Sequence, residues 1–198
     1  MNQIVGYKLW PKAFPGESRG GYLLRMAERN GARGLAHFGR PFNLRPSQMV
    51  ILGPEQVIPV LRGLPYSTEW LSWRPQDLGR ALSVAGGTLR SRVCPVCIGS
   101  DPEPYLRSVW EMPLGCFCEK HLVWLQDHCE VCGRVLSLNR RSIAFCNCGA
   151  SFASFSAVPV STWAVTMLEI FIKAGDPARS ATFALSTSTE RNAGRLLR

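Results

Sequence analysis

The clearest shortages in this sequence are of acidic residues, of histidine and of long hydrophobic runs. The 198 residues include 14 Asp and Glu against 23 Lys and Arg, and three His. No run reaches the roughly 18 uncharged apolar residues of a membrane-spanning helix. The first residues carry Lys8 and Lys12 rather than an apolar signal core. We therefore predict a cytoplasmic protein without a membrane segment.

The same shortages argue against catalysis. Two-metal hydrolases and nucleases use clustered carboxylates, and many zinc hydrolases carry a His-Glu-x-x-His pattern. The sequence has neither arrangement. We therefore predict a protein that is not an enzyme, against the alternative of a zinc-dependent hydrolase or nuclease.

Cysteine, by contrast, is abundant, with eight residues in the chain. Apolar residues make up 46% of the sequence, which indicates a folded protein. In a reducing cytoplasm, Cys-x-x-Cys pairs indicate metal sites more often than disulfides. Disulfides are therefore the less favoured alternative.

The Cys and His pairs have the spacing of zinc ligands. A Cys-x-x-Cys turn directs two sulfurs at one ion, and zinc prefers four ligands in a tetrahedron. Pairing in chain order predicts one site formed by Cys94, Cys97, Cys118 and His121, and another formed by Cys129, Cys132, Cys146 and Cys148. Four soft or imidazole ligands close each site, so we predict two structural Zn²⁺ ions. Interleaved pairing of the motifs stays open.

Three further residues compete for these sites. Cys116 is left over by the pairing, and we predict a buried apolar thiol. His128 shares a turn with the ligand Cys129, so a surface or supporting role is favoured. His37 is an isolated histidine in a helical stretch, where packing is commoner than metal binding.

Charge and pattern divide the chain into three predicted parts. Residues 1–90 hold twelve Lys and Arg against five Asp and Glu, and we expect a basic, helix-turn-helix-like domain. Residues 91–150 are predicted to form a tandem zinc-ribbon module. Residues 151–198 are predicted to form a C-terminal helix and a mobile tail from Gly175. The predicted fold class is mainly α, with small zinc-ribbon β elements.

Local signals place the helices and the aromatic anchors. Ser18 can cap a helix that ends at Asn30 and Gly31. Later helices are predicted at Gly34–Phe38, Pro54–Leu61, Asp77–Ala85 and Thr162–Lys173. Gly133 and Gly149, which follow the ligand pairs, are expected at positive φ.

Core positions are favoured for the tryptophans Trp70, Trp73 and Trp110. Trp110 and Trp124 are also candidate anchors for a protein partner, unless both pack on the zinc site.

The basic N-terminal part predicts an anionic partner. DNA or RNA is favoured over a merely solvated basic surface. The side chains to test first are Arg25, Arg29, Arg33 and Arg40, because the first two share a helix face and the others follow soon after. We therefore expect an association with the bacterial nucleoid.

Several blocks along the chain resemble one known family. They are Pro15–Ser18, Leu24–Ala27, Asn30–Gly31, Arg92–Cys97, Tyr105–Trp110, Cys118–Leu122, Asp127–Gly133 and Cys146–Gly149. Their order and spacing, over residues 14 to about 150, resemble the TniQ family of transposon target-selection proteins. Gly20 and Gly21 depart from the family, which usually has better helix formers there.

The resemblance implies a helix-turn-helix domain joined to zinc ribbons, acting as a non-catalytic adaptor in Tn-seven-like and CRISPR-associated transposition. Such adaptors link a target-recognition module, either a DNA site or an RNA-guided complex, to the AAA+ regulator that recruits the transposase. The alternative is a stand-alone zinc-containing helix-turn-helix transcription factor. The sequence leaves open whether the chain forms homo-oligomers.

Overall fold

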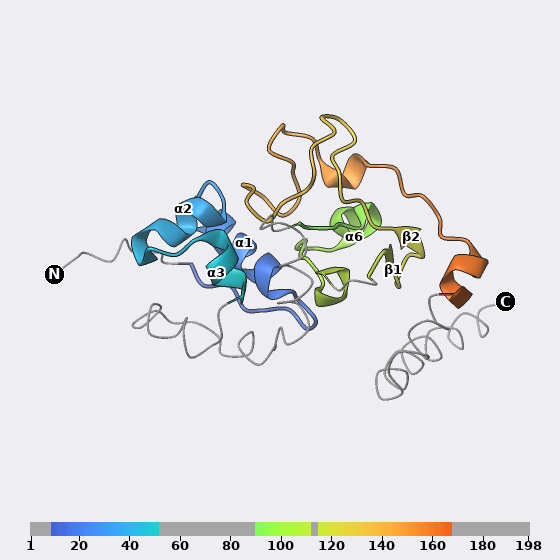
Figure 1. The fold of residues 1–198 in the computed structure, drawn as a ribbon, viewed down its shortest axis with the longest axis horizontal. Coiled ribbons are helices and arrows are strands. Elements are labelled where there is room, and N and C mark those ends of the chain that lie inside the picture. The colour runs from blue at the N-terminus through green and yellow to red at the C-terminus, as the bar shows by residue number, and fades with distance from the viewer. Residues whose placement is uncertain (1–8, 52–89, 112–114, 168–198) are drawn as a thin grey trace.

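The structure, a computed structural model, describes residues 9–51, 90–111 and 115–167 (Figure 1). A mostly helical N-terminal region precedes a cysteine-rich region with a small two-stranded sheet, which confirms the predicted fold class. The elements are α1 (Arg19–Arg29), α2 (Leu35–Gly39), η1 (Arg40–Phe42), α3 (Pro46–Ile51), α6 (Pro95–Ser100), η3 (Ser108–Glu111), β1 (Phe117–Cys118), β2 (Val123–Trp124) and η4 (Phe152–Ser154). Residues 162–167 are also helical. Of the helices described, none has the length and apolar character needed to cross a membrane.

Helix α1 begins and ends where the sequence predicts. The Ser18 hydroxyl accepts a hydrogen bond from the Gly21 amide at 2.9 Å, which satisfies one of the open donors of the first turn. Asn30 is the C-cap, and Gly31 follows at φ 70°, the left-handed conformation that ends many helices. The apolar face of α1 is buried, so packing holds the helix as well as its caps.

Two shorter helices pack beside α1. The predicted stretch from Gly34 forms α2, whereas α3 was not predicted because so short a segment carries little periodicity. The side chain of Gln48 accepts a hydrogen bond from the Arg45 amide at 2.8 Å and so stabilises the start of α3. The three helices contact one another and form one small layer.

Several predicted features lie outside the described residues. These are the helices at Pro54–Leu61 and Asp77–Ala85, the side chains of Trp70 and Trp73, the part of Thr162–Lys173 beyond residue 167, and the tail from Gly175. The division of the chain into three parts also stays a prediction.

Gly20 and Gly21 allow α1 to approach the cysteine-rich region closely. A Cβ atom on Gly20 would collide with the Leu138 side chain, and one on Gly21 would lie 2.7 Å from the Leu106 Cβ. Carbon atoms do not pack this closely without a shift of the structure. Glycine stands in the first turn of α1 because this close contact outweighs its poor helix propensity.

We expect Gly21→Ala to destabilise the protein by about 1–3 kcal/mol through overpacking. In an exposed helix the same change would instead stabilise by up to about 1 kcal/mol. Leu106 is 1% exposed, so its side chain is enclosed by the fold. Urea denaturation measures the difference. Gly99→Ala in α6 is the matched control, with a smaller expected effect because its Cβ would lie 3.3 Å from Ala153. A variant at Gly21 as stable as the wild type would contradict the close contact.

The helical and cysteine-rich regions share one core. The Ser18 amide donates to the Leu106 carbonyl at 2.7 Å, and the Ile143 amide donates to the Glu28 carboxylate at 2.9 Å. Buried side chains of both regions, Trp110 among them, form one continuous apolar cluster. The α1 layer is therefore fixed in position relative to the cysteine-rich region.

Charged groups are also buried in the fold, and Arg140 and Glu111 are two of them. Arg140 is 3% exposed and donates from Nε to the Ser142 carbonyl at 2.8 Å and from Nη1 to the Ser137 carbonyl at 2.7 Å. The carboxylate oxygens of Glu111 are buried, with the Ser18 hydroxyl nearby. Burial raises the pKa of Glu111 to about 7, although a hydrogen bond from Ser18 and the charge of Arg140 act in the opposite direction.

We expect Glu111 to make the folded protein less stable as the pH rises from 4.5 to about 7. In this window the folded protein keeps a proton on Glu111 that the unfolded chain has lost, so each pH unit costs up to about 1.4 kcal/mol. Glu111→Gln removes this penalty at nearly constant volume, and its stability relative to the wild type should therefore increase with pH. The unfolding free energies of both proteins, measured across this pH window, give the difference in stability. Titrating groups that the two proteins share cancel in this difference. A difference that is constant with pH would contradict the raised pKa.

Candidate metal centres

Helix α6 and the β1–β2 hairpin position the first cysteine cluster. Cys94 is the N-cap of α6, and its sulfur accepts a hydrogen bond from the Cys97 amide at 3.4 Å. Pro95 suits the first helical position because no amide is needed there. Cys118 ends β1, which pairs antiparallel with β2, and the turn between the strands passes through Leu122 at φ 51°.

The ligand atoms of the first cluster are close enough to share one ion. His121 lies in the β1–β2 turn, with Nδ1 3.5 Å from the Cys94 sulfur, 3.2 Å from the Cys97 sulfur and 3.7 Å from the Cys118 sulfur. The sulfurs of Cys97 and Cys118 lie 3.6 Å apart. The three cysteines are buried and His121 is half-buried, so the cluster is closed to solvent on most sides.

Turns that end in glycine position the second cluster. The Gly133 amide donates to the Cys129 carbonyl at 2.8 Å, and the Gly149 amide donates to the Cys146 carbonyl at 2.9 Å. The two glycines have φ values of 69° and 92°, as the sequence predicts. Each turn directs its cysteine pair toward the same point.

Both clusters have the dimensions of a tetrahedral metal site. In the second cluster the sulfurs of Cys129 and Cys148 lie 3.6 Å apart, and those of Cys132 and Cys146 lie 3.8 Å apart. Zn–S bonds of about 2.3 Å place tetrahedral sulfurs about 3.8 Å apart, whereas a disulfide needs about 2.05 Å. All eight cysteines are free, and in each cluster the four ligand atoms lie within 4.8 Å of one another. Each cluster can therefore hold a metal ion, and the motifs group in chain order rather than interleaved.

Cationic side chains lie near thiols of both clusters. Hydrogen bonds from the Arg134 backbone and side chain lower the pKa of the Cys132 thiol to about 6. Burial disfavours the charged form of Arg107, but the negative charges of Cys97 and Asp101 raise its pKa. Since thiolates rather than thiols bind metal, the contact of Arg134 with Cys132 favours metal binding at the second cluster.

Three competing residues lie outside both clusters. His128 contacts the Asp127 carboxylate at 2.7 Å on the surface, which agrees with a supporting or surface position. Cys116 is half-buried rather than buried. His37 is exposed and accepts a hydrogen bond from the Arg33 amide at 3.1 Å, so it lies outside the metal clusters but does not pack as predicted.

The arginines predicted to contact nucleic acid differ in their environments. The side chain of Arg25 is 3% exposed, and its guanidinium bonds to Glu17 at 2.7 Å and to Glu103 at 3.0 Å. Arg29 is 51% exposed and pairs with Glu103 at 2.8 Å. Arg25 is thus held inside the fold, because the face of α1 that carries it packs on the cysteine-rich region. We therefore leave Arg25 out of the candidate nucleic-acid surface.

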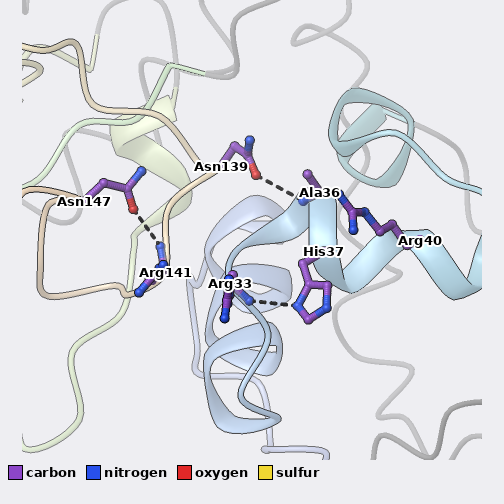
Figure 2. A pocket seen from close by; sticks show the side chains of 7 residues that line it. All are labelled: Arg33, Ala36, His37, Arg40, Asn139, Arg141 and Asn147. Carbon is purple, nitrogen blue, oxygen red and sulfur yellow. Dashed lines mark hydrogen bonds between the residues drawn. The ribbon is translucent and has the colours of Figure 1, made fainter.

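The remaining two arginines, Arg33 and Arg40, are exposed and line a pocket of about 680 Å³ (Figure 2). The pocket lies between α2 and the loops that carry the second cluster. Its polar lining consists of Arg33, His37, Arg40, Asn139, Arg141 and Asn147. Sequence reasoning missed the last three, because they lie about a hundred positions from α2 in the chain and polar residues in loops are common. We call this site the α2–Arg141 pocket.

We compared the sequence with known proteins and protein families. A search of curated proteins found no match. The sequence matches the TniQ family over residues 8–125, more than half of the chain. The matched span contains α1 to α3 and the whole first cluster, and the second cluster follows directly after it. The chain therefore belongs to the TniQ family.

Proposed function

We propose that this chain is a target-selection adaptor that links a target-recognition module, either a DNA site or an RNA-guided complex, to an AAA+ transposition regulator. Membership of the TniQ family implies a role in transposition target selection, and proteins of this family are in general not catalytic. The family match is the observation that carries the proposal. The family match does not identify a specific regulator or selector, so both are part of our proposal.

In this proposal each cluster holds one structural zinc ion. The first is bound by Cys94, Cys97, Cys118 and His121, and the second by Cys129, Cys132, Cys146 and Cys148. Four protein ligands leave no open position for a substrate or an activated water, which is typical of structural zinc. The role of the ions is to make short loops rigid enough to present contact surfaces.

An apolar strip beside the first cluster suits a protein partner. Leu122, Trp124 and Val158 are 50%, 38% and 47% exposed. The Trp124 amide donates to the Val158 carbonyl at 2.9 Å, so these side chains lie on neighbouring segments. Trp110 does not belong to this strip, because it is 1% exposed and packs in the core. Trp124 is therefore the aromatic anchor that we propose for the regulator.

A reconstituted insertion reaction with the transposase and the AAA+ regulator of the same element tests the adaptor role. We expect targeted insertion to depend on this chain, and the regulator to co-purify with it. Trp124→Ala should weaken the co-purification while zinc content stays unchanged. Insertion that is equally efficient and on target without this chain would contradict the proposal. Operator-specific binding that regulates a promoter, without any effect on insertion, would favour the transcription-factor alternative.

A further inference from the structure

The α2–Arg141 pocket joins the two regions of the protein at their surface. Arg33 lies just before α2, His37 lies within α2, and Arg40 begins η1 directly after it. Asn139, Arg141 and Asn147 form the opposite side, from the loops around the second cluster (Figure 2). A hydrogen bond of 3.1 Å from the Ala36 amide to the Asn139 side chain ties the two sides together.

The charge of the pocket is not neutralised by the protein. Its lining contains three arginines and no acidic residue. Among the described residues, the guanidinium groups of Arg33, Arg40 and Arg141 have no ion-pair partner, whereas Arg25, Arg29 and Arg107 each pair with a carboxylate. Three unpaired guanidinium groups around one hollow repel each other, so the pocket favours an anionic ligand.

The polar groups around the pocket are oriented as donors. The Asn139 and Asn147 side chains use their oxygen atoms to accept backbone amides, at 3.1 Å and 3.3 Å, which leaves their NH₂ groups to donate. His37 accepts the Arg33 amide at Nδ1, and its neutral ring then carries the proton on Nε2. A ligand that matches this lining has acceptor atoms only and negative charge, as phosphate oxygens do.

We propose that the α2–Arg141 pocket binds the phosphodiester backbone of a nucleic acid. This inference deepens the proposed adaptor function and rests on it for its biological setting. A protein ligand fits less well, because the pocket offers no aromatic or large apolar side chain as an anchor. Because Arg141 comes from the loops of the second cluster, the bound strand contacts the helical and the cysteine-rich regions together.

The test uses the full, zinc-loaded chain and fluorescent oligonucleotides of one sequence, as duplex DNA, single-stranded DNA and RNA. We expect Arg33→Ala and Arg141→Ala each to weaken binding about tenfold, as for the loss of a charged phosphate contact. Each should also reduce the slope of log affinity against log salt by about one. The three probes show which form of nucleic acid the pocket prefers.

Lys120→Ala is the matched control. It removes one positive charge that is 57% exposed beside the first cluster, away from the pocket, so its effect on binding should stay below about twofold. Zinc content and thermal unfolding establish that all three variants fold. An equal loss for Lys120→Ala and Arg141→Ala would mean that only overall charge matters, and it would overturn the proposal. Wild-type protein that binds none of the probes would overturn it as well.

Two further results separate this proposal from the adaptor role. Pocket variants that bind every oligonucleotide normally but no longer retain the AAA+ regulator would make the pocket a protein contact and overturn the inference, while the adaptor role stands. Insertion that does not need this chain, combined with a specific loss of nucleic-acid binding in Arg33→Ala and Arg141→Ala, would overturn the adaptor role and support the pocket.

Discussion

Cys94→Ser is expected to remove one of two zinc ions per chain and to cost several kcal/mol of stability. Cys94 is fully buried, caps α6 and lies 3.5 Å from His121 in the first cluster. The ion contributes folding free energy because the unfolded chain has no preformed site. The loss also reaches the core, since Cys94 and Cys97 belong to the same apolar cluster as α1. Elemental analysis of purified protein and chemical denaturation measure the two effects.

Cys116→Ser is the control for the loss of a thiol. Cys116 lies outside both clusters and is half-buried, so we expect zinc content to stay at two and stability to fall by about 1 kcal/mol or less. Cys129→Ser should remove the ion of the second cluster instead. Folded wild-type protein that carries no zinc, or Cys94→Ser protein that keeps both ions, would contradict the assignment of the ligands.

Arg25→Ala is expected to destabilise the protein by about 3–5 kcal/mol, as the loss of one partner of a buried ion pair does. Arg25 donates from Nε and Nη2 to the two carboxylate oxygens of Glu17, at 2.9 Å and 2.7 Å, and these side chains are 3% and 1% exposed. Its Nη2 also donates to the Lys12 carbonyl at 2.7 Å, and its Nη1 to Glu103 at 3.0 Å. Without Arg25, Glu17 stays buried with an uncompensated charge, which is the main source of the cost.

Arg29→Ala is the matched control for Arg25→Ala. Arg29 lies one turn further along α1 and pairs with the same Glu103, but it is 51% exposed. We expect a change of about 0–1 kcal/mol, because solvent screens an exposed pair. Equilibrium unfolding in urea compares the variants. Equal effects at the two positions would contradict the structural role of Arg25. A double-mutant cycle with Glu17→Gln isolates the energy of the buried pair itself.

Features that depend only on neighbours in the chain could be predicted from the sequence. The spacing of Cys94 and Cys97, and of Cys129 and Cys132, fixes two sulfurs on one turn whatever surrounds them. Ser18 and Gly31 act within one helix turn, so the start and end of α1 could also be predicted. The sequence also favoured grouping of the ligand pairs in chain order, but it left interleaved pairing open, and the structure decided between the two.

Features that depend on contacts between distant segments became visible in the fold alone. Arg25 and Arg29 share an i, i+4 relationship and both pair with Glu103, yet Arg25 is buried and Arg29 is exposed, because Arg25 alone also pairs with the buried Glu17 and packs on the Phe14 ring. The same packing explains why glycine occupies the first turn of α1. It also buries Trp110 while leaving Trp124 partly exposed.

The α2–Arg141 pocket depends on the fold in the same way. Arg33 and Arg141 lie far apart in the sequence, and they meet at one pocket because α1 and the cysteine-rich region share a core. Periodicity reports which residues lie on one face of a helix, but not which other segment that face meets. The folded chain supplies that information through burial, and burial decided which arginines remain available to a phosphate.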